Sequence, residues 1–322
     1  MPEKTAQTET STTTEKVTTA AAPDTALITA APKPEKARSL WSDAWHDLRR
    51  NPLFLVSSGL IVLLLIIAVF PGLFTNASPR DADLANHYLG APNWSHFFQA
   101  DWFGYDGQGR SIYARVLYGA RASITVGVGV TLLVTVLGTI VGMIAGYFGG
   151  WIDSLLSRIT DIFMGIPFLL GAMVILTTFE KRAVWVVILA LVFLGWTQIA
   201  RVARGAVLTV KQADYVMAAR ALGASTTRIL MRHVLPNAVA PIIVVATIAL
   251  GGYIAAEATL SFLGIGLAEP TVSWGVDVNS GRTQLRNAPH VLIVPSVMVS
   301  MTVLSFLMFG DAVRNALDPK TR

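Results

Sequence analysis

Long apolar runs alternate with short polar segments along most of this chain. Six runs have about the 17–25 residues that a helix needs to cross the hydrocarbon layer of a membrane, the second running slightly longer. The pattern predicts an all-α membrane protein with six transmembrane helices. The runs cover residues 52–70, 122–148, 162–179, 183–200, 234–256 and 291–310.

The N-terminal part of the chain differs from these runs. Residues 1–37 are rich in Thr, Ala and Pro and lack large apolar side chains in a regular pattern, which predicts a disordered tail. Within residues 38–72, a short amphipathic helix with Trp41 and Trp45 on its apolar face precedes the first transmembrane helix. This short helix lies either in the membrane interface or against the protein, and the sequence leaves both interpretations open.

The loops between the runs predict how the chain is oriented. Residues 73–118 are rich in Pro, Gly and aromatic side chains, which predicts a small folded cap on the outer side of the membrane. Residues 119–311 hold the other five helices, and residues 312–322 form a polar C-terminal end. Lys and Arg are most frequent in the loops that lie on the same side as the two termini, including residues 213–237. The positive-inside rule therefore places both termini in the cytoplasm.

The composition agrees with a membrane protein and excludes several other classes. Only 14% of the residues are charged, against about 25% in soluble globular chains. The net charge of +5 is scattered between apolar runs instead of forming a basic stripe, so we expect no nucleic-acid partner. The chain has no cysteine, no phosphate-binding loop, no Gly-x-Ser-x-Gly and no His-Glu-x-x-His. We therefore expect a non-catalytic protein that binds no cofactor or metal of its own.

Residues 213–237, ADYVMAARALGASTTRILMRHVLPN, form a polar segment between two apolar runs, and we call this segment the elbow. Asp214 is placed to cap a helix that Gly223 ends in the left-handed conformation. Ser225 is placed to cap a second helix, which Pro236 then ends. The spacing predicts two short helices that meet at an angle.

The elbow also has a surface suited to contact with another protein. Ala218, Ala219 and Ala221 permit a close approach by a partner, and Arg220 and Arg228 supply positive charge. These features favour docking into a groove on another protein. A solvated loop whose arginines only set the topology is the alternative that the spacing leaves open.

The elbow resembles the cytoplasmic coupling loop of binding-protein-dependent ABC importer permeases. That family has Glu-Ala-Ala, three residues, Gly, nine residues, Ile, one residue and Leu-Pro, and this chain matches at Ala218, Ala219, Gly223 and residues 235–236. It departs from the pattern at Met217, which stands in place of the Glu, and also at the Ile, where it has His.

Three further stretches resemble the dipeptide and oligopeptide branch of that family. They are the run RHVLPN, residues 258–275 (ATLSFLGIGLAEPTVSWG) and residues 102–124 (WFGYDGQGRSIYARVLYGARASI). The run SLWSDAWHDLRRNPL is similar to the N-terminal region of the C-type subunit. The resemblance covers about residues 39–320 and implies a type I ABC importer permease fold.

The resemblance also implies a function and a set of partners. The chain would move dipeptides or oligopeptides inward across the cytoplasmic membrane of a bacterium, with nickel, haem or another small solute as alternative cargo. It would pair with a sister permease as a heterodimer, with two ATP-binding subunits that hold ATP and Mg²⁺, and with an extracytoplasmic substrate-binding protein. The residues expected to couple to the ATPase are Asp214, Tyr215, Met217, Ala218, Ala219, Arg220, Gly223, Ala224, Arg228 and Pro236.

A transporter or channel that works without ATPases is the competing hypothesis, and it predicts several charged residues within the spans. Glu257, in the fifth run, is the acidic candidate, either as a cargo contact or as a structural group. Pro167 is expected to bend the third run. Gly138, Gly142 and Gly146 recur every four residues, which favours close helix packing within the chain or at a seam with a partner.

Overall fold

The computed structural model of the chain describes residues 45–180 and 182–317. The tail predicted for residues 1–37 lies outside the described residues, as does most of the predicted interfacial helix, of which residues 45–48 are described and helical. Within the described ranges all regular secondary structure is helical, and one isolated bridge joins Tyr105 to Ser111. The prediction of an all-α fold is confirmed.

The described helices follow one another along the chain. They are α2 (Pro52–Val69), α3 (Leu84–His87), α4 (Ile112–Phe148), α5 (Gly150–Met164), α6 (Phe168–Thr177), α7 (Val184–Val210), α8 (Asp214–Ala221), α9 (Thr226–Ile229), α10 (Leu235–Phe262), α11 (Trp274–Gly281) and α12 (His290–Leu317). Short turns lie at Pro71–Leu73, Leu230–Val234 and Arg282–Gln284.

Five helical stretches in the described part are long and apolar enough to cross a membrane. They contain α2, α4, α7, α10 and α12. The pair α5 and α6 meets the same criterion when taken together, although the two helices are bent by 81° at their junction. Counting this pair as one broken span gives the six that the apolar runs predicted.

The third apolar run, residues 162–179, for which the sequence predicted a bent span, is divided between two helices. Helix α5 ends at Met164, and Pro167, with φ −58° and ψ 118°, is the N-cap of α6. A proline disfavours the helical conformation at the residue before it and has no N–H for the helical ladder. The predicted bend at Pro167 is therefore confirmed, and it is sharp enough to divide the span.

Several helices extend beyond their apolar runs: α10 continues to Phe262 and α12 to Leu317, and the extensions of α4 and α7 are the longest. Helix α4 begins at Ile112 because the hydroxyl of Ser111 accepts a hydrogen bond from the N–H of Ala114 (3.2 Å), which caps the helix. The predicted cap therefore ends at Ser111, and from here the cap means residues 73–111. Helix α7 continues to Val210 instead of ending at residue 200, so it takes in a polar stretch that the apolar run left out.

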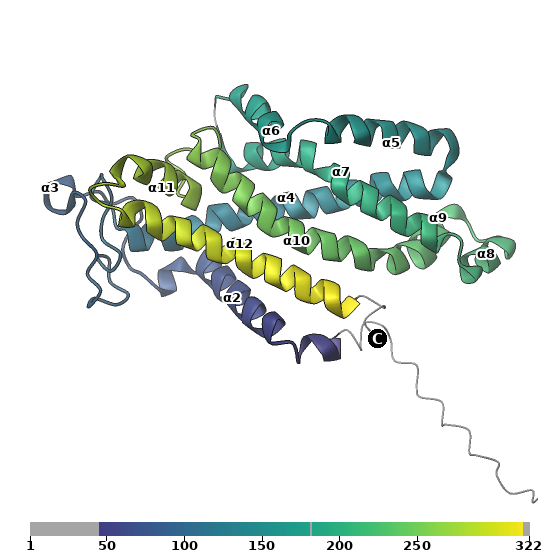
Figure 1. Cartoon of the computed structure of the whole chain (residues 1–322), viewed down its shortest axis with the longest axis horizontal. Helices are drawn as coiled ribbons and strands as arrows, with labels where there is room; N and C mark the ends of the chain where they lie inside the picture. The colour runs from purple at the N-terminus through teal and green to yellow at the C-terminus, as the bar shows by residue number, and fades with distance from the viewer. Residues whose placement is uncertain (1–44, 181, 318–322) are drawn as a thin grey trace, which may run out of the picture. The chain divides into compact units, whose positions relative to one another are not determined.

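Helices α4 and α7 form the centre of the described structure and share the most extensive contact between any two elements (Figure 1). Gly138, Gly142 and Gly146 lie on this contact. A Cβ atom added at Gly142 would lie 2.7 Å from the Cβ of Ala203 and 2.8 Å from the N atom of Arg204. The glycines thus pack two helices of the same chain, as the first of the two sequence interpretations expects.

The remaining long helices pack around this pair. Helix α10 contacts α4, α7 and α12, and α12 contacts α2. Phe54 at the start of α2 packs with Val313 near the end of α12, so these two ends of the chain's helices lie together. The cap and α11 gather at one end of the helices, whereas α8 and α9 project at the other (Figure 1).

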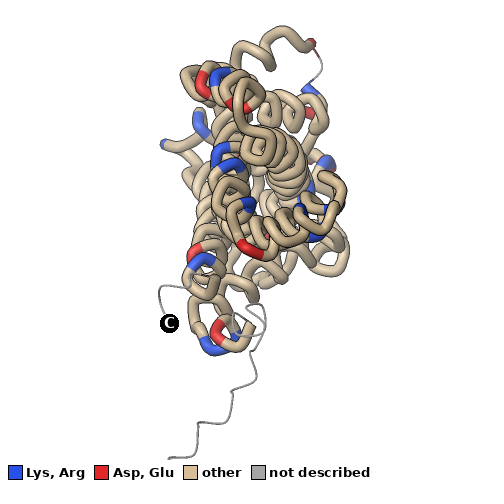
Figure 2. The backbone as a smooth tube through the Cα atoms, turned by 90° about the vertical axis from the view of Figure 1, so that its right-hand side faces the viewer, with Lys and Arg blue, Asp and Glu red and all other residues tan. Residues whose placement is uncertain are grey.

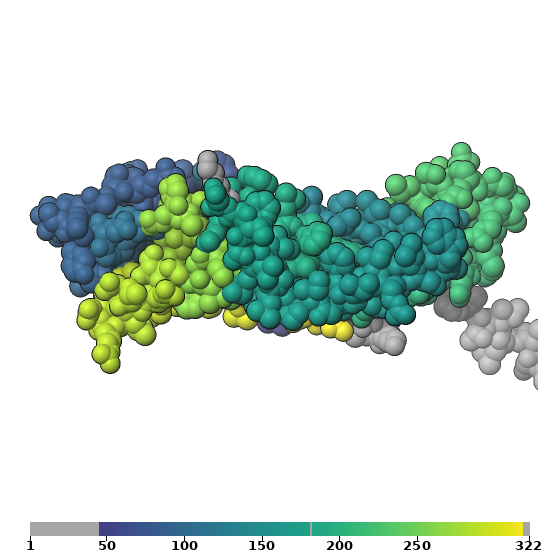
Figure 3. Space-filling view, turned by 90° about the horizontal axis from the view of Figure 1, so that it is seen from above, coloured from purple at the N-terminus to yellow at the C-terminus, as the bar shows by residue number. Residues whose placement is uncertain are grey.

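Helices α5 and α6 lie on the surface between the cap end and the elbow end. Helices α5 and α6, in teal, form much of the face between the cap and the elbow in Figure 3. Figure 2 looks onto the elbow end and shows basic positions around it.

We expect Gly142→Ala to destabilise the protein, because the methyl group would push α4 away from α7. Overpacking of this kind costs about 1–3 kcal/mol. The thermal unfolding midpoint of the purified protein should fall accordingly. Gly59→Ala in α2 is the matched control, since nothing lies within 4 Å of its added Cβ, and alanine is the better helix former. Equal effects of the two substitutions would contradict close packing at Gly142.

Candidate functional site

The elbow consists of two short helices joined at Gly223. The N–H of Gly223 donates to the carbonyl of Arg220 (3.0 Å), and the N–H of Ala224 donates to the carbonyl of Ala219 (3.0 Å). Gly223 has a φ angle of +80°, which glycine adopts without steric cost. These features form a Schellman motif, which ends α8 and redirects the chain. Ser225 caps α9 by accepting a hydrogen bond from the backbone, as predicted.

Two predictions about the ends of these helices are wrong. Helix α8 begins at Asp214 itself, and no side chain caps its N-terminus. The Asp214 carboxylate lies in the first turn, where it complements the positive end of the helix dipole. Pro236 does not end the second helix, because a π-helical turn at Leu230–Val234 lets the helix continue into α10. In that turn the N–H of Leu235 donates to the carbonyl of Leu230, five residues earlier instead of four. The hydrogen-bonding register therefore changes just before Pro236, which has no N–H to contribute.

One side of the elbow is anchored, and the other is exposed. Val216, Ile229 and Val234 are buried against Val207 of α7. Leu222, at the tip beside Gly223, is 88% exposed. Exposed apolar side chains at a projecting tip are typical of contact sites. Of the residues predicted to couple to an ATPase, Ala219 and Ala224 are half-buried, and the others are exposed: Asp214, Tyr215, Met217, Ala218, Arg220, Gly223, Arg228 and Pro236.

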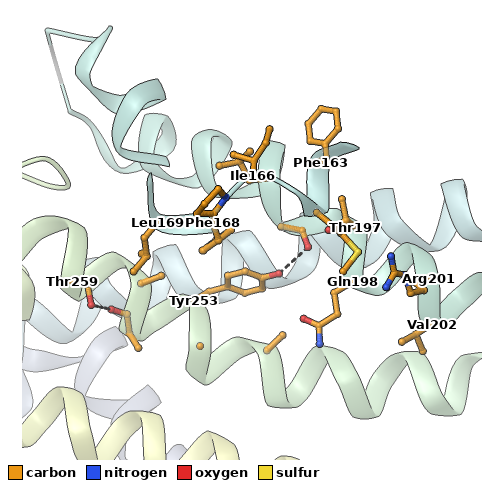
Figure 4. Close-up of a pocket in the computed structure, with 18 residues that line it drawn as sticks. Phe163, Ile166, Phe168, Leu169, Thr197, Gln198, Arg201, Val202, Tyr253 and Thr259 are labelled. Atoms are coloured by element: carbon orange, nitrogen blue, oxygen red, sulfur yellow. Dashed lines mark hydrogen bonds between the residues drawn. The ribbon is translucent and has the colours of Figure 1, made fainter. Parts of the chain in front are cut away.

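A cavity of about 800 Å³ opens beside the junction of α5 and α6. Its walls come from that junction, α7 and α10 (Figure 4). Phe163, Phe168 and Leu169 make much of the wall apolar. Tyr253 of α10 lies in the middle, where its hydroxyl donates to the carbonyl of Gly195 (3.2 Å).

The α7 wall of this cavity also carries polar groups. Gln198 and Arg201 lie on it one helical turn apart (Figure 4). Of the described residues that line the cavity, Arg201 is the one with a charged side chain. The Arg201 guanidinium contacts the carboxylate of Asp161 on α5 at 3.1 Å. The sequence interpretation missed Arg201 because it ended the fourth span at residue 200, and it left Gln198 inside that span without a role. The available signal was the apolar pattern, which continues at helical spacing through Val207 and Val210.

Two stronger contacts tie the end of α7 to its neighbours. Arg204 donates to both carboxylate oxygens of Asp153 on α5, at 2.5 and 2.7 Å. The Lys211 ammonium donates to the carbonyl of Gly146 at 2.6 Å. That carbonyl lies in the last turn of α4, where a cation complements the helix dipole. The C-terminal end of α7, which leads into the elbow, therefore contacts both α4 and α5 through these charged groups.

Glu257 does not line the cavity, whereas Pro167 does. The Glu257 side chain is completely buried, and its Oε1 atom accepts hydrogen bonds from Ser261 (2.8 Å) and Ser273 (3.3 Å). Ser273 caps α11, so Glu257 joins α10 to the segment that starts α11. The contacts are those of the structural alternative.

An ion network with two buried arginines holds the cap end together. Arg110 contacts Asp106 at 2.7 Å and Glu269 at 2.6 Å, and Arg115 pairs with Asp277 of α11. Burial alone lowers the pKa of Arg110, but Glu269 and Asp106 outweigh that effect, so its pKa is raised and its charge is secure. Within residues 45–180 and 182–317 no cluster of His, Asp and Glu is placed to hold a metal ion.

Two family descriptions match this chain. Residues 138–322 match the binding-protein-dependent transport system inner membrane component. Residues 39–92 match the N-terminal TM domain of oligopeptide transport permease C. Together these regions include α2, the C-terminal turns of α4, the cavity and the elbow.

Nearly the whole chain is also similar in sequence to bacterial transport permease proteins. A glutathione transport system permease protein of Salmonella typhimurium is 39% identical over 293 residues, which are 90% of this chain and 94% of that protein. An oligopeptide transport system permease protein of Bacillus subtilis is 37% identical over 288 residues, 89% and 92% of the two chains. The fold is similar to that of the inward-facing MetNI methionine ABC transporter, with a TM-score of 0.51 and 21% identity over 63% of this chain and 96% of that chain.

We expect the buried carboxyl group of Glu257 to support stability through its hydrogen bonds. Glu257→Ala leaves a cavity and removes the acceptor for Ser261 and Ser273, at a cost of about 2–4 kcal/mol. Glu257→Gln keeps the acceptor oxygen and should cost about 1 kcal/mol or less. Thermal unfolding of the two purified variants measures the difference. A midpoint for the Gln variant as low as that of the Ala variant would contradict this structural role.

Proposed function

Since the chain belongs to the family of binding-protein-dependent transport system inner membrane components, we propose that it carries peptides inward. It is a non-catalytic permease subunit of an ABC importer, and the family assignment replaces the competing hypothesis of a transporter without ATPases. Peptide cargo is supported by the similarity, over about nine-tenths of the chain, to permeases named for glutathione and for oligopeptides. The inferred location is the cytoplasmic membrane of a bacterium.

The observation that carries the proposal is the elbow with its exposed tip. We place this elbow in the cytoplasm, together with both termini, seated in a groove of an ATP-binding subunit. Its buried side packs on Val207 of α7, so it is attached to the membrane helices. Its exposed side offers Leu222, Tyr215 and Arg228, which suit a groove with apolar and acidic groups. ATP and Mg²⁺ belong to the partner subunits.

The cavity supports a second part of the proposal, namely that this chain supplies half of the pathway. The wall beside the junction of α5 and α6 would face a sister permease, and the two would enclose the cargo between them. A mainly apolar wall with a few polar groups suits peptides of varied sequence. The cap end, with its ion network around Arg110 and Arg115, would receive the extracytoplasmic substrate-binding protein.

Helix α7 connects these two sites and gives the proposal a mechanism. It carries Gln198 and Arg201 in the cavity and leads directly to the elbow after Val210. Closure of the ATP-binding subunits would displace the elbow, and α7 would pass this displacement to the cavity wall. Rigid-body movement of packed helices is an established way of switching between two arrangements.

We expect Arg228→Glu to weaken the contact with the ATP-binding subunit without unfolding this chain. Arg228 is exposed and follows the joint at Gly223, and reversing its charge opposes an acidic partner surface. Co-purification of the ATP-binding subunit with this chain should fall about ten-fold or more, and ATP-driven peptide uptake should fall with it.

Arg286→Glu is the matched control, because Arg286 is an exposed arginine on the α11–α12 connection at the cap end. It should leave co-purification of the ATP-binding subunit unchanged. Loss of the subunit with Arg286→Glu but not with Arg228→Glu would overturn the proposed seat of the ATPase.

A further inference from the structure

Two ion pairs join α5 to α7, and they differ in a way that points to different roles. Arg204 grips both oxygens of Asp153, and its side chain and that of Asp153 are 37% and 18% exposed. Arg201 touches one oxygen of Asp161, and the two side chains are 56% and 57% exposed. A two-pronged, partly buried pair is held in place, whereas a single exposed contact is readily exchanged. Arg201 is therefore the arginine of the two that is free to take another partner.

The cavity wall around Arg201 has hydrogen-bonding capacity that the described chain does not use. A guanidinium has five N–H donors. In the described ranges the Arg201 guanidinium contacts one other residue, Asp161, so most of its donors have no protein partner. The side-chain amide of Gln198, one turn earlier on α7, makes no hydrogen bond with any residue in the described ranges. Polar groups without partners are costly against lipid, and an arginine within a membrane helix is a candidate functional group. Both groups line the same cavity, so an occupant with acceptor groups would satisfy them.

We propose that Arg201 binds a carboxylate of the cargo in this cavity, exchanging the carboxylate of Asp161 for it. The inference rests on the proposed function, because a peptide carries a terminal carboxylate that fits the planar guanidinium. Gln198 would donate to, or accept from, the peptide backbone beside it. When the cargo leaves, Arg201 pairs with Asp161 again, so the guanidinium always has a carboxylate partner. Such an exchange keeps the cargo bound weakly enough to pass on.

The absence of cysteine from the sequence allows the charge in the cavity to be measured directly. We expect Gln198→Cys, in the assembled importer, to react faster with an anionic methanethiosulfonate reagent than with a cationic one. Adding Arg201→Gln should lower this ratio about ten-fold, because residues three apart on a helix lie about 5–6 Å apart and the two reagents feel opposite forces from the lost charge. Adding Arg204→Gln instead should leave the ratio nearly unchanged. An unchanged ratio with Arg201→Gln, or a cysteine that neither reagent reaches because the sister permease or lipid fills the cavity, would overturn the proposal.

Transport provides the second measurement. Proteoliposomes holding the whole importer would be given trialanine or its C-terminal amide, each at saturating substrate-binding protein. We expect Arg201→Gln to slow uptake of trialanine at least five-fold more than uptake of the amide, Arg201→Lys to restore part of the loss, and Arg204→Gln to slow both peptides equally. Equal losses for both peptides with Arg201→Gln would overturn the proposal. If the unaltered importer moves neither peptide with ATP, the proposed function fails instead, whereas the reagent ratio still reports on Arg201.

Discussion

The close contact between α4 and α7 is the feature on which the rest of the described structure depends. Glycines at four-residue spacing bring the two backbones together, and Ala200 and Ala203 complete the contact from α7. Because packed interiors deform little, two helices held this closely move as one body. Helix α7 also carries the polar wall of the cavity and leads into the elbow. A contact made of the smallest side chains therefore determines how a displacement at one site reaches the other.

The charged groups divide the described part into a fixed end and a changeable middle. Around the cap, Arg110 and Arg115 are buried with the carboxylates of Asp106 and Asp277, and Glu269 joins this network from the exposed side. Removing a buried partner would leave an uncompensated buried charge. In the cavity, Arg201 and Asp161 are exposed and joined by one contact. The junction of α5 and α6 interrupts the third span beside that pair. The strongest electrostatic bonds thus lie away from the place where cargo would pass.

The sequence predicted the features that depend on local chemistry. Apolar length predicted the spans, and the spacing of Gly223 and Ser225 predicted the joint of the elbow. The misses depend on contacts from elsewhere in the chain. Continuation of the helix through Pro236 requires a π-helical turn, and the local sequence does not predict where such a turn forms. Arg201 was missed because it follows the apolar run, although α7 continues past it. The sequence left two roles open for Glu257, because the hydrogen bond that favours the structural role comes from Ser273, far along the chain.

Cross-linking from the tip of the elbow tests the central claim most directly, since Leu222 is 88% exposed and the chain has no cysteine of its own. A photo-reactive group attached to Leu222→Cys in the assembled importer should join this chain to the ATP-binding subunit, and the same group on Leu285→Cys, exposed at the cap end, should not. A tip that joins no ATP-binding subunit, or that a membrane-impermeant reagent reaches from outside intact cells, would contradict the account.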